Sequence, residues 1–283
     1  MAEEYDLSRW GNHLLKRLQK AKNPNMHYYY MFLQGLVNRT MRNEDAVVAV
    51  TGDRGKGKTN FSFASSMIIG GMLPKDRGPP FTWENVSYRY EDIGDIVERA
   101  GDLDQRVYTI DEAIDVARSS DAMTRANKEL GKFMQKARKK RNIYFWNIPY
   151  FTELQSSIRN NVIHFWIHVF HKVVNEKRER EYSVAALYTK DLNPFNRDKW
   201  GFDSVKASEP AIFDTPDLME VLSKKKGFIT FISCPRIPEV IEKKYEINSF
   251  DALRKAGAKF KESMNPSKPK PTPVPEVLKA VEA

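Results

Sequence analysis

The stretch that decides the fold is Val50–Phe61, "VTGDRGKGKTNF". Gly52 is followed, after four further residues, by Gly57, Lys58 and Thr59, which matches the phosphate-binding pattern G-x-x-x-x-G-K-[ST] in full. Glycines permit backbone torsions and close approach that a side chain would block, so the loop N–H groups and the following helix N-terminus can face phosphates. Lys58 is expected to reach the outer phosphates and the Thr59 hydroxyl to hold Mg²⁺.

The surroundings of this loop support a nucleotide site, because an apolar strand is predicted before it (45–52) and a helix after it (58–72). The residues expected to contact the nucleotide are Gly52, Asp53, Arg54, Gly55, Lys56, Gly57, Lys58, Thr59 and Asn60. Arg54 and Lys56 are not required by the pattern. They could add phosphate contacts, face a neighbouring subunit, or simply belong to a basic, solvent-exposed loop tip.

A second part of the site is expected at Asp111–Glu112, in "RVYTIDEA". The residues before Asp111 are largely apolar, so the pair follows a buried strand; Asp111 would hold Mg²⁺ through water and Glu112 would act as general base toward the attacking water. The alternative is an acidic pair that opens a surface helix and complements the helix dipole. A kinase needs no water-activating glutamate, so the pair favours hydrolysis.

A polar amide, Asn147, ends the next predicted strand, "NIYFWNIP". At that position it could contact the γ-phosphate or orient the attacking water. The alternative is an asparagine that starts a turn before Ile148-Pro149.

The order of predicted elements indicates an α/β fold: a three-layer α/β/α arrangement around a mostly parallel sheet. Helices are predicted over 7–21 and 28–37, and strands and helices then alternate as far as Phe170. After Phe170, "HKVVNEKREREYSVAALYTK" predicts two strands joined by a charged turn. The predicted organisation is an N-terminal helical segment (1–43), an ATPase core (44–190), a β-containing C-terminal extension (191–263) and a proline-rich tail (264–283).

Bulk properties limit the class of protein. The formal net charge of +9 suggests an acidic partner such as nucleic acid, although many basic proteins bind none. The single cysteine, Cys234, fits a reducing compartment. The N-terminus does not read as a secretion signal, and the longest apolar stretch is shorter than the ~20 residues that span a bilayer. We therefore expect a cytoplasmic protein with no membrane partner.

Together, Gly52–Thr59, Asp111-Glu112 and Asn147 resemble the additional-strand, catalytic-glutamate division of P-loop ATPases, which includes AAA+ proteins and FtsK–HerA-like DNA pumps. The stretch from "FTWENVSYRY" to "VYTIDEA" looks like FtsK–HerA-type viral and plasmid ATPases, including zonula occludens toxin-like proteins. The resemblance covers roughly residues 44–170. The sequence departs from the pattern of these pumps at Asn147, where they usually carry glutamine. Nothing after residue 190 resembles a known family.

The resemblance implies a Walker B strand separated from the P-loop strand by the sensor strand. It also implies hexameric or similar rings, in which an arginine of one subunit completes the site of the next. Arg159, at the end of the helix before the fifth strand, is the first candidate. The other candidates are Arg125, Arg138, Arg141 and, less favoured, Arg106. Each could instead be a solvated arginine that caps helix carbonyls.

A strip of basic residues is the candidate nucleic-acid contact. Residues 132–142, "KFMQKARKKRN", hold six basic residues and no acidic ones. On a helix, four lysines fall close to one side: Lys132, Lys136, Lys139 and Lys140. Such a strip could follow a phosphate backbone without reading sequence, or it could be a solvated helix face.

These features predict an ATPase that hydrolyses Mg-ATP, assembles as a homo-oligomeric ring and moves, packages or remodels DNA. The alternative is a nucleotide-gated assembly or morphogenesis ATPase that does not move DNA. A DNA-stimulated ATPase assay distinguishes the two.

Overall fold

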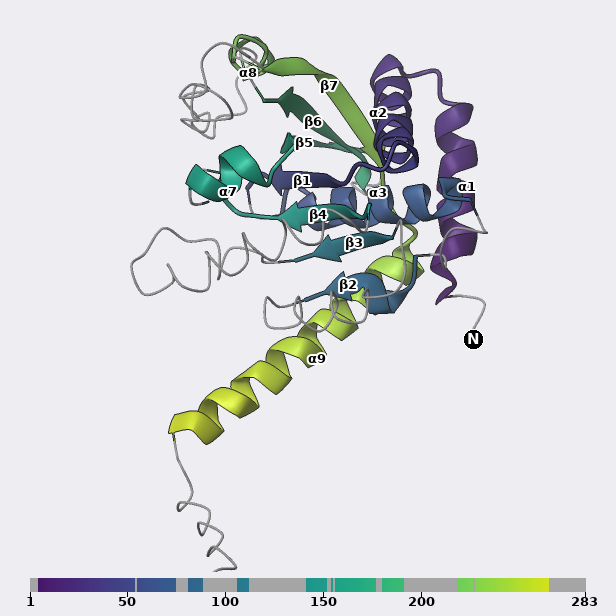
Figure 1. Cartoon of the computed structure of the whole chain (residues 1–283). Helices are drawn as coiled ribbons and strands as arrows, with labels where there is room; N and C mark the ends of the chain where they lie inside the picture. Colours follow the sequence, from purple (N-terminus) through teal and green to yellow (C-terminus); the bar gives the residue numbers. More distant parts are fainter. Residues whose placement is uncertain are drawn as a thin grey trace, which may run out of the picture. The chain divides into compact units, whose positions relative to one another are not determined.

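The structure of the chain is a computed structural model (Figure 1). It describes residues 5–53, 55–74, 81–88, 106–111, 141–151, 154, 156–176, 180–190, 218–225 and 227–264. The chain divides into two compact units between Lys244 and Tyr245, and the first unit holds the sheet. Among the described residues, no helix combines the length and the hydrophobicity that a transmembrane span requires.

The described strands form one seven-stranded sheet in the order β2-β3-β4-β1-β5-β6-β7. The strands are β1 (Ala46–Thr51), β2 (Val86–Ser87), β3 (Val107–Ile110), β4 (Ile143–Asn147), β5 (Phe165–Val174), β6 (Arg180–Thr189) and β7 (Phe228–Pro235). Pairing is parallel from β2 through β5 and antiparallel from β5 to β7. The predicted α/β, mostly parallel sheet is therefore confirmed. β4 lies between β1 and β3. This is the order that the family resemblance implied, in which the sensor strand separates the P-loop strand from the Walker B strand.

Local signals explain where the first helices begin. The Asp6 carboxylate accepts from the N–H groups of Ser8 and Arg9 and starts α1 (Leu7–Gln19). Asn23 caps α2 (Pro24–Met41), whose first residue is a proline that needs no N–H partner there. α3 (Lys58–Met72) begins after Gly57 and covers the residues predicted for the helix that follows the phosphate-binding loop.

Side chains alternate between the two faces of the sheet. On one face, α3 packs against β3 and β4, and the hydroxyl oxygens of Ser66 in α3 and Thr109 in β3 lie 2.7 Å apart. The residues of α3 from Asn60 to Ile69 are all buried, so this helix is a core element. On the other face, Trp166 stacks between Phe151 and Tyr188, with ring centroids 4.6 Å apart in both pairs.

Three shorter elements complete the described part. They are the 3₁₀ helix η2 (Trp83–Asn85), α7 (Ser156–Asn161) and α8 (Leu218–Ser223). Ile158 of α7 and Leu222 of α8 join the apolar cluster around Trp166. A long helix, α9 (Glu239–Met264), follows β7.

The end of the sheet differs from the prediction in one respect. Phe170 was expected to end the fifth strand, with a separate hairpin following, but β5 continues to Val174 and pairs with β6 along most of its length. β5 pairs with β1 over Phe165–His168 and with β6 as far as Val174, with an irregularity in the β6 register between Val169 and His171. The β-containing extension predicted over 191–263 supplies β7, which joins the same sheet.

Several predicted features lie outside the described residues. They are most of the basic strip at 132–142, part of the charged turn after β5, residues 191–217 and most of the proline-rich tail.

Candidate nucleotide-binding site

The loop between β1 and α3 has the backbone form that its glycines predict. Gly52, Gly55 and Gly57 have φ values of 142°, 78° and 106°, a region that other residues rarely adopt. A Cβ atom at Gly52 would lie 2.1 Å from the Val169 carbonyl oxygen of β5, so the loop leaves the sheet in close contact with the neighbouring strand. At Gly55 a Cβ would meet nothing within 4 Å. At Gly52, both the backbone torsion and the lack of space therefore require glycine, whereas at Gly55 only the backbone torsion does.

The Lys58 ammonium folds back over this loop. It donates hydrogen bonds to the carbonyl oxygens of Gly52 and Asp53, the second over 3.2 Å. Lys56 closes a turn through its backbone N–H, which donates to the Asp53 carbonyl over 3.2 Å. Thr59 is half-buried in the first turn of α3. The positive-φ loop, the Lys58 ammonium and the Thr59 hydroxyl fit the phosphates and magnesium of a nucleotide.

A chain of two hydrogen bonds joins α3 to the end of β3. The Ser62 hydroxyl, one turn after Lys58, donates to the Asn147 side-chain oxygen. The Asn147 side-chain nitrogen in turn donates to Asp111 Oδ1 over 2.9 Å. Asn147 is 2% exposed, so its amide is held between these partners and connects the carboxylate to the loop helix.

The strand order explains why these residues meet. β1, β3 and β4 are parallel and end at the same edge of the sheet, with Val50 paired to Asn147 and Ile110 paired to Trp146. Thr51 before the loop, Asp111 and Asn147 therefore share one edge, the usual ligand edge of an open α/β sheet. The fold is that of a P-loop NTPase.

The chain is similar to a number of solved structures, among them the following two. The N-terminal domain of zonular occludens toxin from Neisseria meningitidis shares 14% identity and a TM-score of 0.37, covering 70% of this chain and 98% of that chain. B204, the DNA-packaging ATPase from Sulfolobus Turreted Icosahedral Virus, shares 12% identity and a TM-score of 0.33, covering 52% of this chain and 93% of that chain. The first is a protein of a kind that the sequence resembles. No protein-family model and no curated protein matches the sequence.

Asn60 has a structural partner that the loop pattern does not reveal. Its side-chain oxygen accepts from the Ile237 N–H over 2.9 Å, and its nitrogen donates to the Pro235 carbonyl over 3.3 Å. The residue is 4% exposed. Its side chain therefore holds the junction between β7 and α9.

A second buried hydrogen-bonded group lies beside the start of the P-loop. The Trp166 indole Nε1–H donates to Thr51 Oγ1 over 2.8 Å, and the same oxygen lies 3.0 Å from His168 Nδ1. Burial, together with the charges of Lys225 and Lys58, lowers the pKa of His168 to about 4. The imidazole is therefore neutral near pH 7. Because Thr51 Oγ1 accepts from Trp166, we assign its hydroxyl as the donor to His168 Nδ1 and place the ring proton on Nε2.

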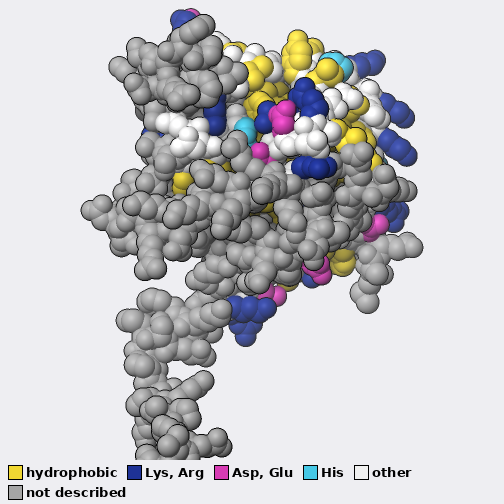
Figure 2. Space-filling model, viewed as in Figure 1, with side chains coloured by type: hydrophobic (Ala, Val, Ile, Leu, Met, Phe, Trp, Pro, Cys, Tyr) yellow, Lys and Arg dark blue, Asp and Glu magenta, His cyan; other side chains and the backbone are white. Residues whose placement is uncertain are grey.

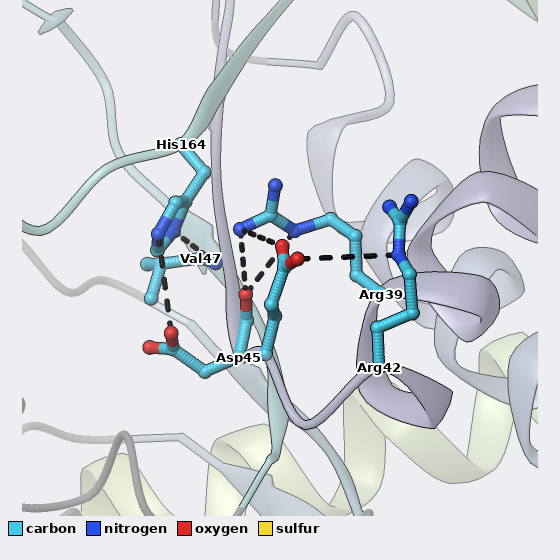
Figure 3. Close-up of polar contacts among 6 residues, drawn as sticks. Arg39, Arg42, Asp45, Val47 and His164 are labelled. Atoms are coloured by element: carbon cyan, nitrogen blue, oxygen red, sulfur yellow. Dashed lines mark hydrogen bonds and ion pairs between the residues drawn. The ribbon is translucent and has the colours of Figure 1, made fainter.

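His164 belongs to a different group at the amino ends of β1 and β5 (Figure 3). Its Nδ1 accepts from the Val47 N–H over 3.0 Å, and its Nε2 lies 3.9 Å from Asp45 Oδ1. Arg39 binds the Asp45 carbonyl and pairs with Glu44 over 3.1 Å. This group connects α2 to the sheet, at the edge opposite the P-loop.

The described arginine candidates lie in different places around the sheet. Arg106 and Arg141 come just before β3 and β4, at the edge opposite the P-loop. Arg159 lies half-buried in the last turn of α7. The other predicted site residues lie outside the described residues: Arg54, Glu112, Arg125, Lys132, Lys136, Arg138, Lys139 and Lys140.

Two polar residues of this region were missed from the sequence. Ser62 holds Asn147, and Thr51 joins Trp166 to His168. A signal for Ser62 was present, because a polar side chain in a fully buried stretch of helix needs a hydrogen-bond partner. Nothing local indicated Thr51.

Proposed function

We propose that the protein is a Mg-ATP-hydrolysing P-loop ATPase that assembles as a ring and acts on DNA. The observation that carries the nucleotide site is the Ser62–Asn147–Asp111 chain, which ties a Walker B carboxylate to the first turns of the P-loop helix. A magnesium-binding carboxylate beside the loop is common to P-loop switches and ATPases, so the pairing supports a nucleotide site that handles phosphoryl groups. Glu112, the residue after Asp111, is what favours hydrolysis over a passive switch.

Each residue has a role that follows from its position. The loop N–H groups and Lys58 would bind the phosphates, and Thr59 and Asp111 would hold Mg²⁺. Bound Mg²⁺ would supply charge neutralisation at the phosphates. Asn147, donating to Asp111, would orient that carboxylate and stand close to the transferring group. Glu112, the next residue in the chain, would accept the proton of the attacking water.

DNA as the partner and ring assembly are the finer parts of the proposal. A net charge of +9 supports a polyanionic partner. A trans-acting arginine, with Arg159 as first candidate, would require a neighbouring subunit. An assembly ATPase that leaves DNA in place is the alternative.

The test is an ATPase assay with and without duplex DNA, on the wild type and two variants. Glu112→Gln should bind ATP yet turn over at least ~100-fold more slowly, because it removes the general base. Lys58→Ala should lose ATP binding itself. Normal turnover by Glu112→Gln would refute the base assignment, and hydrolysis that ignores DNA would favour the assembly ATPase.

A further inference from the structure

The first two helices form an unusually basic segment. From Leu7 to Asn43 the chain has no aspartate or glutamate. It has seven lysines and arginines: Arg9, Lys16, Arg17, Lys20, Lys22, Arg39 and Arg42. Arg39 and Arg42 pair with Glu44, just beyond this segment. The excess of positive charge therefore lies mainly on α1, which has no acidic residue of its own.

α1 places most of this charge on one exposed side. Its buried residues recur at helical spacing: Leu7, Gly11, Leu14 and Leu18. Four cations are exposed on the opposite side, and we call them the α1 strip: Arg9, Lys16, Arg17 and Lys20. Figure 2 shows a row of Lys and Arg side chains along the right-hand edge of the molecule, the side on which α1 lies in Figure 1. From Arg9 to Lys20 the strip extends about 16 Å, at ~1.5 Å per residue.

The buried face of α1 packs directly on the P-loop helix, α3. A Cβ atom at Gly11 would lie 2.2 Å from the Met67 carbonyl oxygen of α3, so the two helices approach to backbone contact. At Gly71 of α3, a Cβ would lie 2.9 Å from the Asn12 side-chain oxygen of α1. The two glycines allow this close approach, so α1 packs directly on the helix that begins at Lys58.

We propose that the α1 strip binds the phosphate backbone of duplex DNA, without sequence preference. This rests on the proposed function, of which it names one DNA-contacting surface. A row of long cations opposite a fully packed apolar face can neutralise successive phosphates. An anionic membrane is the less suitable partner, because the apolar side of α1 is buried against α3 and cannot insert between lipids.

The experiment measures binding of the full-length protein to a short, mixed-sequence, fluorescein-labelled duplex by anisotropy, between about 50 and 200 mM salt. The test variant is Lys16→Gln/Arg17→Gln/Lys20→Gln. The matched control, Lys224→Gln/Arg254→Gln/Lys255→Gln, removes three exposed charges elsewhere. The test variant should bind at least ~10-fold more weakly, and its slope of log affinity against log salt should fall by about 2 to 3. The control should stay within about twofold of the wild type.

Three outcomes would overturn the proposal. The first is a test variant that binds DNA as tightly as the wild type. The second is an equal loss of DNA affinity in the control variant, which would reflect net charge alone. The third is binding to phosphatidylserine vesicles through the strip with no binding to DNA. Circular dichroism checks that the variants are folded. ATP turnover without DNA, measured in parallel, separates this proposal from the proposed function. If the protein hydrolyses ATP but DNA binding does not depend on the α1 strip, only the proposal for the strip is rejected.

Discussion

At the scale of single residues, Asn147 connects two parts of the candidate site. Asn147→Ala removes its bonds to Ser62 and Asp111 together. Because residues that orient metal-binding carboxylates typically contribute 10- to 100-fold to activity, we expect kcat to fall by about that factor while the protein remains folded. Single-turnover hydrolysis of ATP, with binding measured separately, checks this.

Ser62→Ala is the matched control for Asn147→Ala. It removes the bond on the α3 side only, so it should lower the free energy of unfolding by about 1 kcal/mol and change kcat less than Asn147→Ala does. Equal kcat values in the wild type and Asn147→Ala would show that Asn147 is only a structural residue.

His168 makes stability depend on pH. Its pKa is about 4 in the folded chain and near 6.5 when unfolded, so the unfolded chain takes up the proton first as pH falls. Stability from this group is therefore complete above pH 6.5 and is lost between roughly pH 6.5 and pH 4, by about 2 kcal/mol from pH 7 to pH 5. Urea unfolding at both pH values should show a smaller loss for His168→Asn than for the wild type. Parallel losses would exclude His168 as the source.

At the scale of elements, the contact between α1 and α3 depends on Gly11. Gly11→Ala would place a methyl group against the Met67 carbonyl, and the helices would have to separate. We expect a loss of about 1–3 kcal/mol in the free energy of unfolding. Gly35→Ala in α2 is the control, because a Cβ there meets nothing within 4 Å. It should be neutral or stabilising by up to ~1 kcal/mol, since alanine favours the helix. Equal effects of the two changes would contradict close packing at Gly11.

Prediction at the element scale succeeded where the signal was local. α3 covers the residues predicted from the loop pattern and its apolar run, and β4 ends at Asn147 as predicted. β5 was predicted too short, because its continuation beyond Phe170 is stabilised by pairing with β6 and not by its own hydrophobic pattern. The Asn60 amide also could not be placed, since its partners lie more than 170 residues further along the chain.

At the scale of the whole molecule, the proposed ring predicts a change in mass. If an arginine from a neighbouring subunit completes the site, then ATP held without hydrolysis should favour assembly. Glu112→Gln with Mg-ATP should therefore run as a multiple of the monomer mass in light scattering, and Lys58→Ala under the same conditions should not. A monomeric Glu112→Gln protein, with ATP binding confirmed, would argue against a shared site.

The sequence by itself determined the phosphate-binding loop, the helix after it and the alternation of strands and helices. These follow from local causes: glycine torsions, apolar periodicity and residues that cap or end helices. Only the tertiary structure decided which side chains meet. Ser62 and Asn147 are 85 residues apart, and they pair because β4 inserts between β1 and β3 beneath α3. The order of strands in a sheet depends on packing between distant segments, so the contact between loop helix and carboxylate appears only in the folded chain.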